Sequence, residues 1–266
     1  MTTQTVGASS DLLLRSDADG ICTLTLNRPA QRNALSIALM EAISTALEQI
    51  KTDPEVRVVV ITGAGPAFCA GHDLKELRAE PNRAHYERTF ALCSAMMQRI
   101  IALPQPVIAA VHGIATAAGC QLVATCDLAV AAEEAHFATP GVNIGLFCST
   151  PMVALSRAVP RKQAMEMLLT GEPIDGPTAL RLGLVNRLAP APQVMEEALD
   201  LAAEIIAKSP LTLKIGKQAF YRQAELSLAE AYDHASQVMT ENMMALDAQE
   251  GIDAFLEKRR PQWKGC

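Results

Sequence analysis

Two kinds of apolar pattern take turns along the first 190 or so residues of the chain, one typical of strands and the other typical of helices. The run of residues 56–61 is β-branched and almost uninterrupted, and it ends at Thr62-Gly63, which is typical of a strand buried on both faces of a parallel sheet. Other stretches carry apolar residues every third or fourth position, as on one face of a helix. The patterns predict strands over residues 21–26, 56–61, 106–111 and 128–132, and helices over residues 36–52 and 83–102. Strands that alternate with helices indicate an α/β layer fold with right-handed crossovers.

The pattern changes after about Val194, where no further strand is predicted. Helical periodicity covers residues 196–208, 210–223, 226–244 and 249–258. We therefore expect two parts, a core over residues 1–194 and a helical C-terminal region over residues 195–266 that shares apolar surface with a partner chain.

Composition supports a globular protein that needs no disulfide or metal to fold. The chain has 266 residues, of which 50% are hydrophobic, and a chain of this size can bury about 70% of its unfolded surface. Its net charge is −6 and it has no basic block, which argues against nucleic acid or an anionic membrane as the main partner. An anionic ligand would have to be bound by local features.

The seven cysteines and the N-terminus predict the compartment. The cysteines are odd in number, lie in apolar stretches and show no CxxC spacing, so we expect buried free thiols in a reducing compartment. Residues 1–10 lack the basic and apolar order of a secretory signal and the arginines of a transit peptide. The sequence therefore predicts a cytoplasmic location. No His, Cys or carboxylate cluster has metal-ligand spacing, and no metal is expected.

Residues 100–126 contain no Asp, Glu, Lys or Arg, and this length would be enough to cross a bilayer. Proline, glycine, glutamine and histidine interrupt the segment, however. Short apolar runs with such boundaries are typical of buried strands, so no membrane span is predicted.

Small residues surround the predicted strand end in Ile61–Leu77. A dinucleotide fingerprint needs glycine at position 68, where Phe68 stands, and a P-loop needs lysine at position 72, where His72 follows Gly71. One interpretation is a glycine-rich turn with Asp73 as N-cap and Glu76 completing a capping box. The other is that backbone N–H groups near Gly71 and His72, at a helix start, are free to bind a ligand.

A second stretch of small residues, His112–Leu122, also follows a predicted strand. Alanines and glycine here allow close helix packing, or close approach of a ligand to the backbone. Two such strand ends could direct two N–H groups at one carbonyl oxygen.

Six ordered blocks make the chain resemble the crotonase, or enoyl-CoA hydratase/isomerase, family over nearly its whole length. The blocks are LNRPAQRNALS, AFCAGHDLKEL, PVIAAVHGIATAAGCQLVATCDLAVA, FATPGVNIGL, ALRLGLVNRL and EGIDAFLEKRRPQW. This resemblance implies a crotonase-like spiral of ββα repeats and a helical C-terminal region that builds homotrimers, often joined into homohexamers.

The resemblance also implies the ligand, an acyl-CoA thioester, so that coenzyme A is part of the substrate and no tightly bound cofactor is needed. Its carbonyl oxygen would lie in an oxyanion hole formed by the backbone N–H groups of His72 and Ala118. The implied contacts to coenzyme A are Gln31, Arg32, Ala70, His72, Asp73, Leu74 and Lys75, with Phe255 and Lys258 from a neighbouring subunit.

The chain departs from the hydratases of this family at two positions. These enzymes use two glutamates to handle water and proton, whereas this sequence has Gln121 and Gly141 at the matching places. Each general acid–base group contributes about 10² to 10⁴-fold to the rate. Efficient hydration of a 2-enoyl-CoA is therefore not expected, and the pattern resembles a branch of the family that lacks both glutamates.

Other side chains near these positions are candidates to replace the two glutamates. His72 titrates in a range that suits proton transfer, but it could equally cap its loop or face solvent. Asn143 could hydrogen-bond an acyl group or a water molecule, and Cys148 is interpreted as a thiol in a pocket wall. Two hypotheses remain open, an enzyme that stabilises an enolate and an acyl-CoA-binding or regulatory protein without catalysis.

Overall fold

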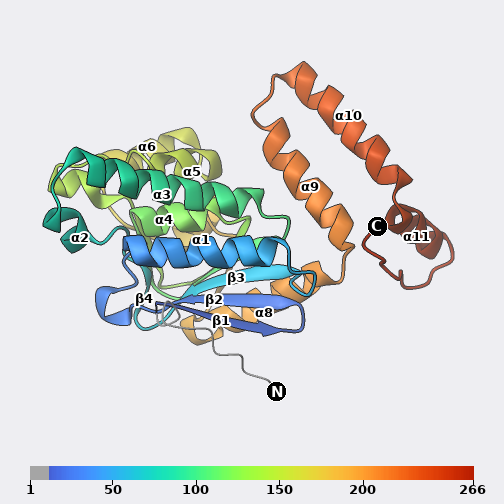
Figure 1. Ribbon diagram of the computed structural model, residues 1–266, viewed down its shortest axis with the longest axis horizontal. Coiled ribbons are helices and arrows are strands. Elements are labelled where there is room, and N and C mark those ends of the chain that lie inside the picture. The colour runs from blue at the N-terminus through green and yellow to red at the C-terminus, as the bar shows by residue number, and fades with distance from the viewer. Residues whose placement is uncertain (1–11) are drawn as a thin grey trace.

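Two β-sheets form the framework of the computed structural model, which describes residues 12–266 (Figure 1). The larger sheet has the order β1-β2-β3-β5-β7-β10 and the smaller one β4-β6-β8-β9. In the larger sheet the strands are β1 (Leu13–Ala18), β2 (Ile21–Leu26), β3 (Val58–Gly63), β5 (Val107–Val111), β7 (Leu128–Ala132) and β10 (Arg187–Ala189). In the smaller sheet they are β4 (Ala67–Cys69), β6 (Ile114–Thr116), β8 (His136–Ala138) and β9 (Ile174–Asp175). From β2 to β10 the larger sheet is parallel, and only β1 pairs antiparallel.

The chain repeats one unit three times. In β3-β4, β5-β6 and β7-β8 the first strand lies in the larger sheet, the second lies in the smaller sheet, and helices follow. The helices of this part are α1 (Ile37–Lys51), α2 (Leu74–Ala79), α3 (Arg83–Ala102), α4 (Ala118–Thr125), α5 (Pro151–Ala158), α6 (Arg161–Thr170), α7 (Gly176–Leu182) and α8 (Val194–Ile206). Three short 3₁₀ turns complete it, η1 (Pro29–Gln31), η2 (Pro140–Ile144) and η3 (Ala191–Gln193). The predicted α/β class with ββα repeats is confirmed.

The core lies around β3, where the sequence predicted a strand buried on both faces. Val58, Val59 and Val60 are fully buried between parallel neighbours β2 and β5. Burying a valine or a similar side chain contributes about 1.5–3 kcal/mol each, so this run stabilises the centre of the sheet.

The charge-free segment of residues 100–126 is divided among the end of α3, β5, β6 and α4. No helix within residues 12–266 is long and apolar enough to cross a membrane. The apolar run is explained by burial, because β5 is inaccessible along its whole length.

The C-terminal helices α9 (Pro210–Gln223), α10 (Leu228–Met244) and α11 (Leu246–Leu256) project from the core (Figure 1). Helix α8, in contrast, packs on the larger sheet through Ala198, Leu201 and Ala202. Neither α9 nor α10 contains a buried residue. The division of the chain at residues 194 and 195 stays a prediction.

Six of the cysteines are buried free thiols, as predicted, and Cys266 is exposed. Burial raises the pKa of the Cys69, Cys93 and Cys120 thiols to about 12. These thiols stay protonated at neutral pH and act as small apolar side chains in the core.

Candidate functional site

The segment between β4 and α2 carries His72 next to a backbone bridge with Leu35. The N–H of Leu35 donates to the carbonyl of Gly71 at 2.7 Å, and the N–H of Asp73 donates to the carbonyl of Leu35 at 3.1 Å. In such a parallel bridge the N–H of the middle residue, His72, points away from Leu35. It has no hydrogen-bond partner among the residues that the structure describes.

The start of α4 presents the second backbone N–H. Ala118 is the first residue of this helix, so its N–H cannot bond within the helix, and no other partner for it is found between residues 12 and 266. Ala117 precedes it with φ +51° and ψ −118°, a conformation that suits glycine and costs about 1–3 kcal/mol in other residues. Strain of this kind persists where the surrounding structure holds the backbone in place.

Glycines bring these two segments into contact. A Cβ atom at Gly71 would come 2.8 Å from Cβ of Ala117 and 3.3 Å from the backbone nitrogen of Ala118. A Cβ atom at Gly119 would come 2.0 Å from the carbonyl oxygen of Cys69. Only glycine permits this approach, and it places the backbone of residues 71–72 beside the N-terminus of α4.

The imidazole of His72 packs edge-on against Phe90 of α3, with ring centroids 5.4 Å apart. Burial lowers the pKa of His72 to about 4, so the ring is neutral at pH 7. Its Nε2 atom is inaccessible and has no hydrogen-bond partner among the described residues.

Asp73 begins α2 as its N-cap, as predicted, and accepts hydrogen bonds from the N–H groups of Lys75 and Glu76. It also pairs with Arg28, at 2.8 Å between Nη2 and Oδ2. The predicted capping box is wrong, because the carboxylate of Glu76 accepts from the N–H of Ile37 at 2.9 Å and so caps α1. These contacts, which join residues far apart in sequence, fix α2 to the start of α1.

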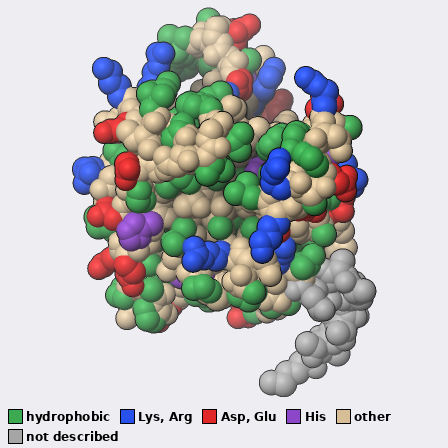
Figure 2. Space-filling model, turned by 90° about the vertical axis from the view of Figure 1, so that its left-hand side faces the viewer, with side chains coloured by type: hydrophobic (Ala, Val, Ile, Leu, Met, Phe, Trp, Pro, Cys, Tyr) green, Lys and Arg blue, Asp and Glu red, His purple; other side chains and the backbone are tan. Residues whose placement is uncertain are grey.

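The residues expected to contact coenzyme A from this chain lie around the same segment. The N–H of Ala70 donates to the carbonyl of Arg32 at 3.0 Å, which joins the η1 loop to the end of β4. Gln31, Arg32, Leu74 and Lys75 have exposed side chains. On the face of the molecule that carries α2, Lys and Arg side chains lie near the middle among hydrophobic ones (Figure 2).

Gln121 lies one turn after Ala118 on α4 and is 4% exposed. The Oε1 atom of its side chain is inaccessible and lacks a hydrogen-bond partner among the described residues. A buried acceptor without a partner is uncommon in proteins.

Gly141 lies in η2 and has no room for a side chain. A Cβ atom there would come 2.6 Å from the carbonyl oxygen of Leu146 and 2.9 Å from Sγ of Cys148. A glutamate at this position would therefore require residues 146–148 to move. Burial raises the pKa of Cys148, although the N–H of Gly141 partly offsets this, so the thiol is protonated and suits a pocket wall.

Asn143 lies two residues after Gly141, and the C-terminal candidates lie on another element. Asn143 is exposed on η2, with its Nδ2 beside Gly171, where an added Cβ atom would come within 3.1 Å. Phe255 lies in α11 and Lys258 follows shortly after its end, on the opposite side of the molecule from α2 (Figure 1). Within one chain the structure does not bring Phe255 and Lys258 to His72 and Ala118.

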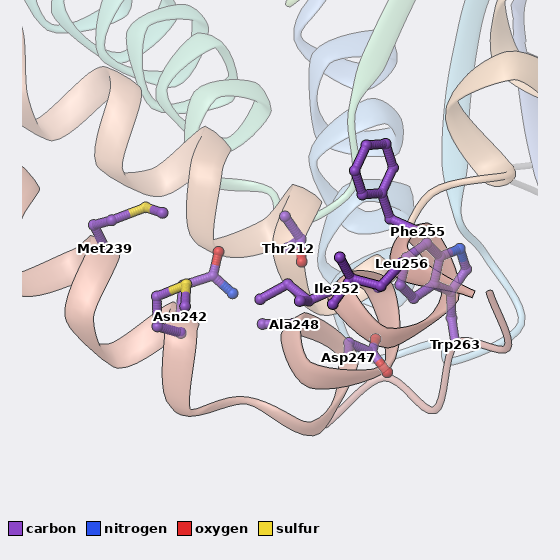
Figure 3. Close-up of a pocket in the computed structure, with 11 residues that line it drawn as sticks. Thr212, Met239, Asn242, Asp247, Ala248, Ile252, Phe255, Leu256 and Trp263 are labelled. Carbon is purple, nitrogen blue, oxygen red and sulfur yellow. The ribbon is translucent and has the colours of Figure 1, made fainter. Parts of the chain in front are cut away.

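A separate cavity of about 350 Å³ lies among α9, α10 and α11. Figure 3 shows its mostly apolar lining, with the side chains of Met239, Ile252 and Leu256 around it and Trp263 on one side. In the part of the chain from residue 12 onward, no group of three or more His, Cys, Asp and Glu side chains is arranged to hold a metal ion.

Comparisons with known proteins identify relatives over almost the whole chain. Residues 16–266 match the family model described as enoyl-CoA hydratase/isomerase. The mitochondrial enoyl-CoA hydratase domain-containing protein 3 of Rattus norvegicus is 49% identical over 92% of this chain and 82% of its own length. This likeness confirms the resemblance to a branch of the family, since the proteins of that branch carry this name.

Solved structures confirm the crotonase-like fold. An enoyl-CoA hydratase of Mycobacterium smegmatis is 54% identical and has a TM-score of 0.93, with 95% of this chain and 98% of that chain covered. The human enoyl-CoA hydratase domain-containing protein 3 is 46% identical and has a TM-score of 0.92, with 95% and 100% covered.

The predicted cytoplasmic location is contradicted by these comparisons. The relatives from rat, mouse, human, Xenopus laevis and Danio rerio are all named as mitochondrial proteins. The prediction depended on the composition of residues 1–10, which lie outside the described residues, and on thiols that indicate only a reducing environment.

Proposed function

Because the chain belongs to the enoyl-CoA hydratase/isomerase family, we propose that it binds an acyl-CoA thioester through the N–H groups of His72 and Ala118. The observation that carries this proposal is that the segments of His72 and Ala118 adjoin, because Gly71 contacts the N-terminus of α4. The N–H groups of both residues lack a partner among the described residues. A helix N-terminus favours negative charge, so the site suits an oxygen that becomes an oxyanion. Removing one such donor from an enzyme typically costs about 2.7–4 kcal/mol of transition-state stabilisation.

Coenzyme A is proposed to lie over the η1 loop and the start of α2, near Gln31, Arg32 and the segment from Ala70 to Lys75. The exposed side chains of Arg32 and Lys75 supply positive charge for its phosphates. Phe255 and Lys258 of a neighbouring subunit would complete the site at the nucleotide end. Phe255 is 83% exposed in the single chain, which leaves it free for such a contact.

Calorimetric titration with two ligands tests the proposal. Butyryl-CoA has the thioester carbonyl, whereas S-butyl-CoA, a thioether, lacks it. We expect butyryl-CoA to bind about tenfold more tightly, which corresponds to about 1.4 kcal/mol and is a modest value for two hydrogen bonds. No binding of either ligand at near-millimolar concentration would defeat the proposal, and equal binding would defeat the role of the two N–H groups.

For the reaction, we propose that the two N–H groups stabilise a thioester enolate, with the proton moved by a group still to be identified or by the substrate. The retained pair of N–H groups favours this enzyme function. With a panel of enoyl-, 3-hydroxyacyl- and malonyl-type CoA thioesters, at least one compound should be turned over.

If the protein binds these thioesters but turns over none of them, the second candidate function is favoured, an acyl-CoA-binding or regulatory protein. The observation in its favour is that positions 121 and 141 carry no carboxylate. Gln121→Glu alone is the informative variant, because Gly141 has no space for a side chain. Hydratase activity gained by this variant would show that proton handling was the missing function.

We also propose that the chain assembles as a homotrimer or homohexamer. Support comes from α9 and α10, which contain no buried residue, and from the large exposed apolar side chains of α10 and α11.

A further inference from the structure

Helix α11 carries Phe255 in its last turn, and Lys258 follows two residues after its end. The buried residues of this helix are Asp247 and Ala254, so a single small apolar side chain is fully packed. Apolar burial of that size gives little resistance to a tilt of the helix. The two side chains proposed to reach coenzyme A in a neighbouring subunit therefore depend on polar contacts for their position.

Asp247 joins the start of α11 to the junction of α8 and α9 and to the chain end. Its Oδ2 accepts a hydrogen bond from the hydroxyl of Ser209, the N-cap of α9, at 2.6 Å. Its Oδ1 accepts from the N–H of Lys264 at 2.6 Å, and the N–H of Gly265 donates to Oδ1 and Oδ2 at 3.2 and 3.0 Å. The N–H of Asp247 donates to the carbonyl of Cys266 at 3.0 Å. Asp247 is 1% exposed and both of its oxygens accept, which is typical of an ionised carboxylate with charge-assisted hydrogen bonds.

A second set of contacts fixes the chain that follows α11. Lys258 has the left-handed φ of +57° with which many helices end, and the chain turns back there. The guanidinium of Arg259 pairs with Glu250 of α11, at 2.6 Å between Nη1 and Oε1. The indole N–H of Trp263 donates to the carbonyl of Ala207, at the end of α8, at 2.8 Å. The C-terminal tail thus folds back along α11, and its end returns to Asp247.

We infer that Asp247 is a positioning residue for the nucleotide end of coenzyme A bound by a neighbouring subunit, and this inference rests on the proposed function. Asp247 and Phe255 are eight residues apart, which is about 12 Å along a helix. Phe255 points away from Asp247 (Figure 3), so the carboxylate acts on the ligand only through the direction of α11. A tilt at the start of this helix would displace Phe255 and Lys258 together.

Calorimetric titration with butyryl-CoA and S-butyrylpantetheine, which has the same thioester but no nucleotide, tests this inference. We expect wild-type protein to bind butyryl-CoA about tenfold more tightly. Asp247→Asn keeps the size of the side chain and removes its charge. It should weaken butyryl-CoA about three- to tenfold and change S-butyrylpantetheine by less than about twofold. The matched control is Asp253→Asn, the same change at an exposed position of α11, which should weaken neither ligand.

A second variant releases the chain end and leaves the carboxylate in place. Gly265→Pro removes an N–H that donates to Asp247, and proline cannot adopt the φ of +77° that this glycine has. It should weaken butyryl-CoA selectively as well, and it decides the question if Asp247→Asn does not fold. Both variants should keep the assembled mass of wild type in light scattering, because a positioning role requires the neighbouring subunit to be present.

Equal wild-type affinity for the two ligands would overturn the inference and leave thioester binding intact. The inference would also be wrong if the two variants weaken both ligands equally or weaken neither. A variant that loses the assembled mass would assign Asp247 to assembly instead of positioning. Failure of both ligands to bind to wild-type protein would defeat the proposed function, and the inference with it.

Discussion

At the scale of single residues, Gly141 sets a packing limit next to the candidate site. We predict that Gly141→Ala destabilises the protein by about 1–3 kcal/mol, because the added methyl group would overlap the carbonyl of Leu146 and the thiol of Cys148. Urea unfolding measures the change. Gly216→Ala, at a position on α9 with open space, is the control and should be neutral or stabilising. If Gly141→Ala is as stable as wild type, residues 146–148 can move to admit a methyl group at little cost in free energy.

Because the pKa of His72 is lowered by burial, we predict that the stability of the protein depends on pH. Burial lowers its pKa to about 4 in the folded protein, below the value of about 6.5 in an unfolded chain. The unfolded state therefore binds the proton first, so the contribution of neutral His72 is complete above pH 6.5 and is lost as the pH falls toward 4.

We expect wild-type protein to lose more unfolding free energy between pH 7 and pH 5 than His72→Gln does, as measured by urea unfolding at both values. The exposed His136→Gln serves as control and should behave as wild type. If His72→Gln loses as much as wild type, the acid sensitivity comes from another group.

The sequence indicated which residues gather at the candidate site, but not their environment. The small residues at Gly71, Ala117 and Gly119 predicted two accessible strand ends, and these do meet. The low pKa of His72 and the unpaired Oε1 of Gln121 depend on neighbours brought by other elements, such as Phe90 from α3. No local pattern of residues contains that information.

At the scale of elements, a mostly buried polar cluster attaches α9 to the core. Nζ of Lys217 pairs with Asp127 at 2.7 Å and donates to the carbonyls of Ile100 and Gln105 at 2.9 and 3.0 Å. The hydroxyl of Tyr221 donates to the same carboxylate at 2.8 Å. This cluster connects α9 to the end of α3 and to the segments that precede β5 and β7.

We predict that Lys217→Met destabilises the protein by about 3–5 kcal/mol, because Asp127 would remain in a mostly buried place without its cation. Lys214→Met, at an exposed position of the same helix, should change stability by no more than about 0.5 kcal/mol. Thermal or urea unfolding of the two variants distinguishes them. Similar small losses in both would mean that α9 is held by other contacts.

Long elements were predicted well and short ones were missed. The helix of residues 83–102 was predicted with the bounds that the structure has, because it carries several periods of its pattern, and the five-residue strand of residues 128–132 was predicted from its uninterrupted apolar run. Strands β4, β6 and β8 have three residues each and β9 has two. A two-residue period cannot be recognised over so few positions, so the smaller sheet could not be inferred from the pattern.

At the scale of the whole molecule, the C-terminal helices expose more apolar surface than a single chain would keep in water. Leu228, Tyr232, Met244, Phe255 and Leu256 are each at least 70% exposed on α10 and α11. Large apolar side chains that are this exposed on two neighbouring helices indicate an interaction site. It agrees with the homotrimer or homohexamer that the family resemblance implies.

We predict that light scattering after gel filtration gives three or six times the 28.4 kDa mass of the chain. The double variant Met244→Glu, Phe255→Glu should shift toward a single chain, because charged groups at an apolar contact are costly to bury. Leu14→Glu on the edge strand β1, where Leu14 is 46% exposed, is the control and should keep the assembly. A wild-type protein with the mass of one chain would contradict the prediction.

The close packing around Gly141 also has an evolutionary consequence. A carboxylate at this position cannot arise by one tolerated substitution, because residues 146–148 would first have to adopt another path. Any lineage that reached this loop conformation could regain a second glutamate only through an ordered series of changes, with the loop altered before the acid.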